Sequence, residues 1–175
     1  MNPILEKLAG TDRRSTGRSD EVVAEVLAHP TLFDAVFEGM LADDPVVRMR
    51  AADAVEKITA QHPEYLRPYK NKLISQVARI DQQEIRWHVA QMLSRLDLSR
   101  AERRAVADLL ADYMRDKSKI VKTFSMQALA DIAEKDADLR PSIVMQLQEL
   151  TRAGSPAMQS RGRKLLARLA RKSDT

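Results

Sequence analysis

The sequence contains no cysteine, which excludes disulfide bonds, thiolate metal sites and cysteine nucleophiles. Aromatic residues make up only 4% of the 175 residues, whereas alanine, leucine, arginine and the two acidic residues are abundant. This composition favours closely packed helices over a β-sandwich or a β-barrel. With 44% hydrophobic residues, a chain of this length can bury a substantial core and suits a single domain.

Long hydrophobic runs are also missing, because charged residues interrupt every apolar stretch within a few positions. The first ten residues, MNPILEKLAG, lack the basic segment and apolar core of a secretory signal. We therefore expect no membrane span, no secretory signal and a cytoplasmic location.

Motifs of known catalytic sites are absent as well. The sequence has no phosphate-binding loop, no Gly-x-Ser-x-Gly elbow, no His-Glu-x-x-His pair and no cluster of histidines and carboxylates at metal-ligand spacing. Two of the three histidines, His29 and His62, precede prolines where we expect helices to end. We expect no enzymatic activity, no cofactor and no metal site.

The most informative feature present is an internal repeat, with four similar segments at intervals of 36 to 38 residues. In each segment, apolar or small residues recur at positions i, i+4, i+7, i+8 and i+11, which is the spacing of one buried helical face. The segments are PVVRMRAADAV from Pro45, QEIRWHVAQML from Gln83, KIVKTFSMQAL from Lys119 and PAMQSRGRKLL from Pro156, and their stripes begin at Val47, Ile85, Val121 and Met158.

A second apolar-periodic segment precedes each of these helices, and the boundaries carry capping residues. Asp44 before Pro45 and Ser155 before Pro156 are typical of helix starts, and Ser99 with Glu102 has the form of a capping box. We expect the preceding helices over residues 31–42, 64–80, 99–115 and 138–151. The pattern predicts one domain, 1–175, with N-terminal cap helices in 1–30 and repeats over 31–62, 63–97, 98–135 and 136–172.

The segment DDPVVRMRAADAVEKI, residues 43–58, resembles the second helix of HEAT repeats, with an acid and a proline in the turn, then Val-Arg and an alanine-rich stripe. The resemblance extends over about residues 31–171. It implies an all-α fold, an α/α superhelix (α-solenoid) of four HEAT-type helix pairs with N-terminal capping helices. It also implies a right-handed superhelix that acts as a protein interaction module.

In that family, turn acids and cations form a ladder of ion pairs between neighbouring repeats. The matching cations here are Arg48, Arg86 and Lys122. The neighbouring acids are Asp43 or Asp44, Asp81 and Asp116. The fourth repeat has Gln159 at the cation position and no turn acid, so we expect the ladder to stop at the third repeat.

The first thirty residues fit the repeat less well. We expect helices over 2–9 and 19–28, the second capped by Ser19, and a polar loop, GTDRRSTGR, between them. These helices are expected to cover the apolar face of the first repeat. The run Arg-Arg-Ser-Thr in the loop also matches the charge pattern that a basophilic kinase recognises, which leaves a regulatory role open.

Aligning the repeats brings side chains outside the buried stripe into rows, which we expect to face the concave surface where solenoids bind partners. The row with Arg50 mixes cations with an aromatic residue, as interface hot spots do, and we expect Phe124 to be partly exposed beside an exposed His88. The alternative for Trp87 is that it packs between repeats instead of facing the partner. The predicted partner-binding residues are Arg50, Trp87, His88, Gln91, Phe124, Gln127, Arg161 and Lys164.

The sequence does not identify the partner, which we expect to be a protein. Residues 152–175 contain seven basic residues and one acidic residue, so the alternative is nucleic-acid binding through the last helix. This alternative includes a remote similarity to HEAT-like DNA alkylation-repair proteins, in which Trp87 and Asp131 would take part. A groove of mixed charge sign argues against it.

Overall fold

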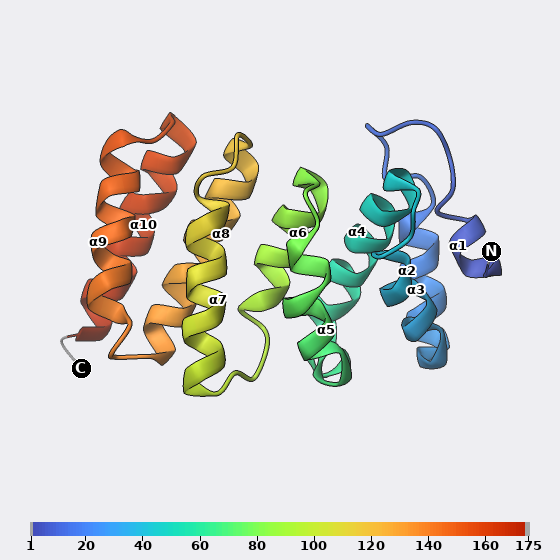
Figure 1. The fold of residues 1–175 in the computed structure, drawn as a ribbon, viewed down its shortest axis with the longest axis horizontal. Coiled ribbons are helices and arrows are strands. Elements are labelled where there is room, and N and C mark those ends of the chain that lie inside the picture. The colour runs from blue at the N-terminus through green and yellow to red at the C-terminus, as the bar shows by residue number, and fades with distance from the viewer. Residues whose placement is uncertain (1, 174–175) are drawn as a thin grey trace. The chain divides into compact units, whose positions relative to one another are not determined.

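The computed structural model describes residues 2–173, and this part of the chain is built of helices and turns, without a β-strand (Figure 1). It contains ten α-helices and three short 3₁₀ segments. The chain divides into two compact units, which meet in the sequence between Met92 and Leu93. The prediction of an all-α fold of consecutive helix pairs is confirmed.

In the N-terminal unit, the long helix α4 packs against both α2 and α3. It begins as predicted, because the Asp44 side chain accepts a hydrogen bond from the backbone N of Val46 (2.8 Å) and Pro45 occupies the first turn. The helices of this unit are α1 (Pro3–Glu6), α2 (Ser19–Ala28), α3 (Phe33–Gly39), α4 (Pro45–Gln61), α5 (Lys70–Ser75) and α6 (Gln83–Leu93), whose last residue belongs to the next unit.

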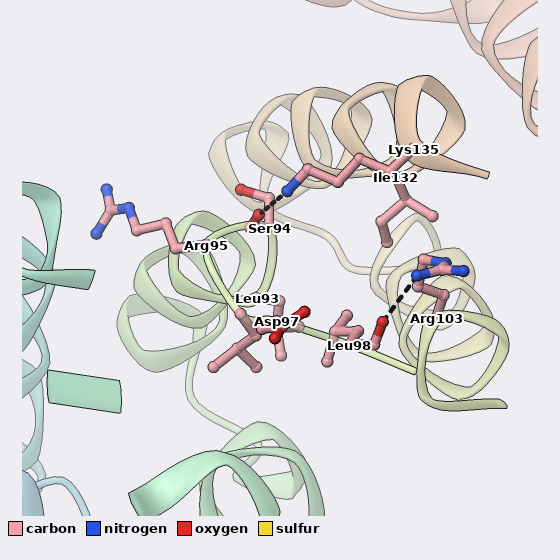
Figure 2. Close-up of a pocket in the computed structure, with 9 residues that line it drawn as sticks. Leu93, Ser94, Arg95, Asp97, Leu98, Arg103, Ile132 and Lys135 are labelled. Carbon is pink, nitrogen blue, oxygen red and sulfur yellow. Dashed lines mark hydrogen bonds between the residues drawn. The ribbon is translucent and has the colours of Figure 1, made fainter. Parts of the chain in front are cut away.

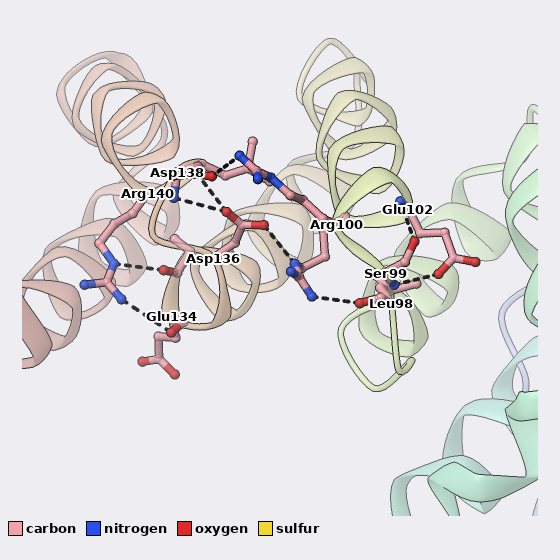
Figure 3. Close-up of polar contacts among 11 residues, drawn as sticks. Leu98, Ser99, Arg100, Glu102, Glu134, Asp136, Asp138 and Arg140 are labelled. Carbon is pink, nitrogen blue, oxygen red and sulfur yellow. Dashed lines mark hydrogen bonds and ion pairs between the residues drawn. The ribbon is translucent and has the colours of Figure 1, made fainter.

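In the C-terminal unit, α10 packs against α8 and α9, and α7 packs against α8. The predicted capping box is present at the start of α7, where Ser99 and Glu102 each accept a hydrogen bond from the other's backbone N (Figure 3). The helices are α7 (Arg100–Tyr113), α8 (Lys119–Lys135), α9 (Arg140–Ala153) and α10 (Pro156–Ser173).

The repeated stripes form the core of both units. Every stripe position of α4, α6 and α8 is buried, including Leu96 just after α6, and in α10 only Leu166 remains partly exposed. Burying a side chain such as leucine or valine contributes about 1.5–3 kcal/mol, so these stripes supply much of the stability. The periodicity therefore identified the buried face of each second helix correctly.

The first helices of the first two repeats are shorter than predicted. Instead of continuous helices over 31–42 and 64–80, the structure has 3₁₀ turns at Pro30–Leu32, Pro63–Tyr69 and Val77–Arg79 beside the short helices α3 and α5. Pro68 lies inside the second of these turns. Proline has no backbone N–H and clashes with the preceding turn, which explains why an α-helix does not run through it.

The N-terminal segment covers α3 and α4 as expected, because α1 packs on α3, α2 packs on α4, and Ile4, Leu8, Val22 and Val26 are buried. The assignment of Ser19 as a helix cap is wrong. Ser19 is the first residue of α2, makes no cap, and its buried hydroxyl donates to the carboxylate of Asp53. Its role is to tie α2 to α4.

Among the described residues, one of the predicted ladder pairs forms, between Arg86 Nη2 and Asp81 Oδ1 at 2.9 Å. Arg48 instead donates to the side chain of Gln82 (2.9 Å) and to the carbonyls of Ala42 and Asp43 (2.8 and 3.0 Å). The Asp44 carboxylate is occupied by capping α4. Within the described residues, the ammonium of Lys122 forms no ion pair.

The C-terminal unit has a polar tie that the ladder pattern did not predict (Figure 3). The buried Asp136, between α8 and α9, accepts from Arg103 Nε (2.8 Å) and from the backbone N of Asp138 and Leu139 (3.1 Å each). The hydrogen bond from Arg103 lowers the pKa of Asp136 below its usual range. One carboxylate therefore orders the α8–α9 turn and fixes it to α7.

Candidate functional site

The candidate site of the N-terminal unit depends on Arg50, which was predicted to be an exposed binding residue. That prediction is wrong, because only 5% of Arg50 is exposed. Its guanidinium donates to four backbone carbonyls of the loop between α1 and α2. The acceptors and distances are Leu8 O (3.1 Å), Ala9 O (2.7 Å), Asp12 O (3.0 Å) and Ser15 O (3.0 Å).

Two glycines allow this loop to close around the guanidinium. Gly17 has a φ of +58°, a left-handed conformation that favours glycine. A Cβ at Gly10 would come within 2.6 Å of the Arg50 guanidinium, and one at Gly17 within 2.7 Å. We call residues 8–18 the Arg50 loop. It is held by carbonyl acceptors and by close approach, because almost all of its side chains are exposed.

The Arg50 loop forms one wall of a cavity of about 400 Å³, and α4 and α6 form the others. We call it the Trp87 cavity. A volume of this order lies within the range of ligand-binding pockets. Its lining residues are Arg13, Arg14, Ser15 and Thr16 from the loop, Met49, Arg50 and Asp53 from α4, and Glu84, Trp87 and His88 from α6.

Trp87 and His88 are adjacent in this cavity, with ring centroids 5.7 Å apart and planes inclined by 62°. Trp87 is partly exposed, as a contact residue should be. The prediction that His88 is exposed is wrong, because 9% of it is accessible. His88 lies three residues after the buried Ile85 and four before the buried Met92, which places it beside the buried stripe rather than on the outer face.

The Nδ1 atom of His88 is buried and has no hydrogen-bond partner in the structure. Leaving a polar atom in this state costs about 1–3 kcal/mol, so a binding molecule that supplies a partner gains from it. Burial lowers the pKa of His88, although the carboxylates of Asp53, Glu56 and Glu84 act to raise it and Lys57 acts to lower it. The imidazole is therefore neutral at pH 7.

The charged groups around the cavity differ in how far they are already paired. Asp53 accepts from Ser19 and forms an ion pair with Lys57 at 2.8 Å. Glu84, in contrast, forms no ion pair within the described residues and accepts only a 3.3 Å bond from its neighbour Gln83. At the rim, the exposed guanidinium groups of Arg13 and Arg14 also have no acidic partner among the described residues.

Four of the other predicted residues lie in the C-terminal unit, and two of them, Gln127 and Arg161, are bonded to each other. Arg161 Nη1 donates to Gln127 Oε1 (2.8 Å), and Gln127 Nε2 donates to Asp131 (3.0 Å). Arg168 pairs with Asp131 (2.7 Å) and Glu134 (2.8 Å). This network connects α8 to α10, so Arg161 and Gln127 are held within the fold.

Three predicted residues keep an accessible side chain outside that network. The expected partial exposure of Phe124 is confirmed, and Lys164 is exposed. Gln91 is partly exposed and donates to the backbone carbonyl of Trp87 (3.2 Å). The structure brings three predicted residues, Arg50, Trp87 and His88, together in one cavity, and of these only Trp87 is partly exposed rather than buried.

A second cavity, of about 310 Å³, lies in the C-terminal unit beside the segment between α6 and α7 (Figure 2). Its cations are used by the protein itself. Lys135 Nζ donates to Ser94 O (3.0 Å), and Arg103 donates to Leu98 O (2.7 Å) as well as to Asp136. The arrangement serves to fix the segment against α8, and it is a weaker candidate for a ligand site.

The loop wall of the Trp87 cavity and the roles of Glu84 and Asp53 were not predicted from the sequence. Gly10 and Gly17, on either side of the polar loop, were the available signal, because paired glycines mark places where another group approaches the backbone closely. Glu84 precedes Trp87 and His88 by three and four residues, so their proximity on one helical face was readable from spacing.

The described residues contain no group of three or more histidine, aspartate or glutamate side chains that could hold a metal ion. None of the described helices is both long enough and apolar enough to cross a membrane.

Comparison with known families gives a match that extends over most of the chain. The family model described as a HEAT repeat domain matches residues 6–169. No curated protein matches the sequence. The matched range includes the Arg50 loop, α4 and α6, so the whole Trp87 cavity lies within it.

Proposed function

Because this chain belongs to the HEAT-repeat family, whose members generally serve as scaffolds for protein interactions, we propose that it binds a partner protein through the Trp87 cavity. The observation that carries the proposal is a cavity of about 400 Å³ that contains a partly exposed tryptophan and a buried imidazole nitrogen without a partner. Tryptophan is among the residues most enriched at interface hot spots, where one partner fills a pocket on the other.

The rigidity of the site supports this proposal. α4 and α6 are regular helices of 17 and 11 residues, and four hydrogen bonds from Arg50 hold the loop wall in place. A preformed pocket loses little conformational entropy when a partner side chain enters it. The partner therefore gains most of the free energy of burying the tryptophan face.

The charge distribution does not favour nucleic acid as the ligand of this cavity. Cations from the loop alternate with Asp53 and Glu84, so no continuous positive track lines it. In the basic last helix, Arg161 and Arg168 are already bonded to α8, and the exposed cations among the described side chains of that helix are Arg163, Lys164 and Arg171.

The proposal is tested by affinity capture from native lysate with three proteins, namely the wild type, Trp87→Ala and the control Asn71→Ala. Asn71 is exposed on α5 and does not line the cavity. We expect at least one protein that the wild type and Asn71→Ala enrich equally and Trp87→Ala enriches at least tenfold less. Circular dichroism checks that both variants stay helical. Equal enrichment of every captured protein by Trp87→Ala would overturn the proposal.

A further inference from the structure

We infer that the Trp87 cavity takes a guanidinium group, supplied by an arginine side chain of the partner that acidic residues flank. This inference rests on the proposed function, since it specifies which side chain of a protein partner enters the cavity. The observation behind it is the set of groups that line the cavity together, namely the indole of Trp87, the unpaired carboxylate of Glu84 and the imidazole of His88, whose buried Nδ1 has no hydrogen-bond partner.

The first complementary group is the carboxylate of Glu84. It lines the cavity one helical turn before Trp87 and His88, and no cation of the described residues pairs with it. A guanidinium can donate two parallel N–H bonds to a carboxylate, which is the strongest common side-chain pairing. Glu84 is therefore available for an incoming arginine, whereas Asp53 is already shared by Ser19 and Lys57.

The second and third groups are the two rings. The indole of tryptophan is the best aromatic surface for a cation, and guanidinium stacks on it more readily than ammonium because it is planar and weakly hydrated. The neutral imidazole of His88 has one nitrogen that accepts a hydrogen bond, and its Nδ1 is the atom that lacks a partner. An arginine has five N–H donors, so it can pair with Glu84 through two of them and direct another toward the imidazole of His88.

The electrostatic surroundings of His88 indicate the sign of the ligand's charge. Asp53, Glu56 and Glu84 all favour positive charge on the ring of His88, and Lys57 opposes it. Arg50, in the cavity wall, directs its donors to the carbonyls of its loop. The carboxylates near His88 therefore attract a cation, and this attraction must offset the cost of burying the charge there.

The rim has the opposite sign. Arg13 and Arg14 line the cavity from the exposed loop and have no acidic partner among the described residues. They repel cations at the entrance, although solvent screens this repulsion at the surface. A segment with one arginine between aspartates or glutamates matches both parts, because its flanking carboxylates meet Arg13 and Arg14 while its guanidinium reaches Glu84.

The test uses the intrinsic fluorescence of Trp87, which is the sole tryptophan of the chain. The probes are three peptides, acetyl-Asp-Arg-Asp-amide and the same peptide with citrulline or lysine in place of arginine. Citrulline keeps the shape of arginine and lacks its charge. We expect saturable change of the emission with the arginine peptide, at least tenfold weaker binding of the citrulline peptide and several-fold weaker binding of the lysine peptide.

Two variants separate binding in the cavity from general attraction. Glu84→Gln should lower the affinity for the arginine peptide at least fivefold. The matched variant Glu6→Gln changes an exposed carboxylate outside the cavity and should leave this affinity unchanged. Arg14→Ala should lower the affinity for the acidic-flanked arginine peptide about twofold to threefold. The comparison of arginine with citrulline needs no variant, so it stands even where a substitution disturbs folding.

Equal binding of the arginine and citrulline peptides would overturn this inference, and so would a Glu84→Gln protein with unchanged affinity. Absence of any fluorescence change with the arginine peptide at millimolar concentration would overturn it too. If the peptides fail while partner capture still depends on Trp87, the arginine inference is wrong and the proposed function stands. Capture that does not depend on Trp87 removes the proposed function itself.

Discussion

Replacing Arg50 by alanine is the substitution with the largest expected effect on stability in the N-terminal unit. Arg50 is 5% exposed and donates four hydrogen bonds to the carbonyls of its loop, at 2.7 to 3.1 Å. Hydrogen bonds that involve a charged group contribute about 1.5–3 kcal/mol each. Part of this is recovered because the released carbonyls can bond to water, so we expect a loss of about 3–5 kcal/mol.

A loss of this size is a large part of the total stability of a typical domain, which is about 5–15 kcal/mol. It corresponds to a fall of roughly 10 °C in the melting midpoint for a chain of this length. Urea and thermal unfolding should be followed by Trp87 fluorescence, because Trp87 lies in the same unit as Arg50. Arg50→Lys keeps the charge and loses the forked donors, so it should recover less than half of the loss.

The same variant should release the loop, and limited trypsin digestion detects this. Cleavage after Arg13 and Arg14 should be at least tenfold faster in Arg50→Ala than in the wild type. A suitable stability control is Arg14→Ala, because Arg14 is exposed and its guanidinium forms no bond within the described residues. The free energy of unfolding of this variant should stay within about 0.5 kcal/mol of the wild-type value. If Arg50→Ala lowers the free energy of unfolding by less than about 1 kcal/mol, this explanation of the loop is refuted.

Three further predictions concern other parts of the chain. Because burial lowers the pKa of His88, the unfolded chain takes up a proton first as pH falls below about 6.5. The free energy of unfolding should therefore decline there by up to about 1.4 kcal/mol per pH unit. His88→Asn should reduce this dependence of stability on pH, which chemical denaturation at several pH values measures. Asp136→Asn should lower stability by about 1–3 kcal/mol at pH 7. Because Arg103 lowers the pKa of Asp136 in the folded protein, the unfolded wild-type chain takes up the proton first as pH falls below about 4, so this difference should shrink there. DNA binding at about 50 mM salt should be weak in a filter-binding assay, because Arg161 and Arg168 are bonded to residues of α8. Tight DNA binding that is lost when Arg161 and Arg168 are replaced would favour the nucleic-acid alternative.

The second helices of the repeats could be predicted from sequence because their hydrophobic spacing reports directly on burial. All the stripe positions except Leu166 are buried as expected. The first helices were less predictable, since Pro68 and the short 3₁₀ segments around it break the period without removing the apolar residues. Cap signals at Asp44 and Ser99 were reliable because they depend on local backbone groups alone.

The candidate site was predicted only in part, for a physical reason that the repeat alignment ignores. Aligning repeats assumes that each row outside the buried stripe stays open to solvent. At Arg50 this assumption fails, because a loop without any hydrophobic period folds over the side chain and is held by its own carbonyls. Backbone acceptors are the same in every sequence, so no residue pattern signals them, and only Gly10 and Gly17 hinted at a close approach.

The most direct test of the central claim is site-specific photo-crosslinking of the partner at the rim of the Trp87 cavity. A benzoylphenylalanine at position 14, which lines the cavity, is compared with one at position 71 on α5, which does not. Both positions are exposed, so neither substitution should unfold the chain. The account predicts a crosslinked partner at position 14 that is lost on Trp87→Ala, and none at position 71. Crosslinking at position 71 alone, or crosslinking at position 14 that persists in Trp87→Ala, would contradict it.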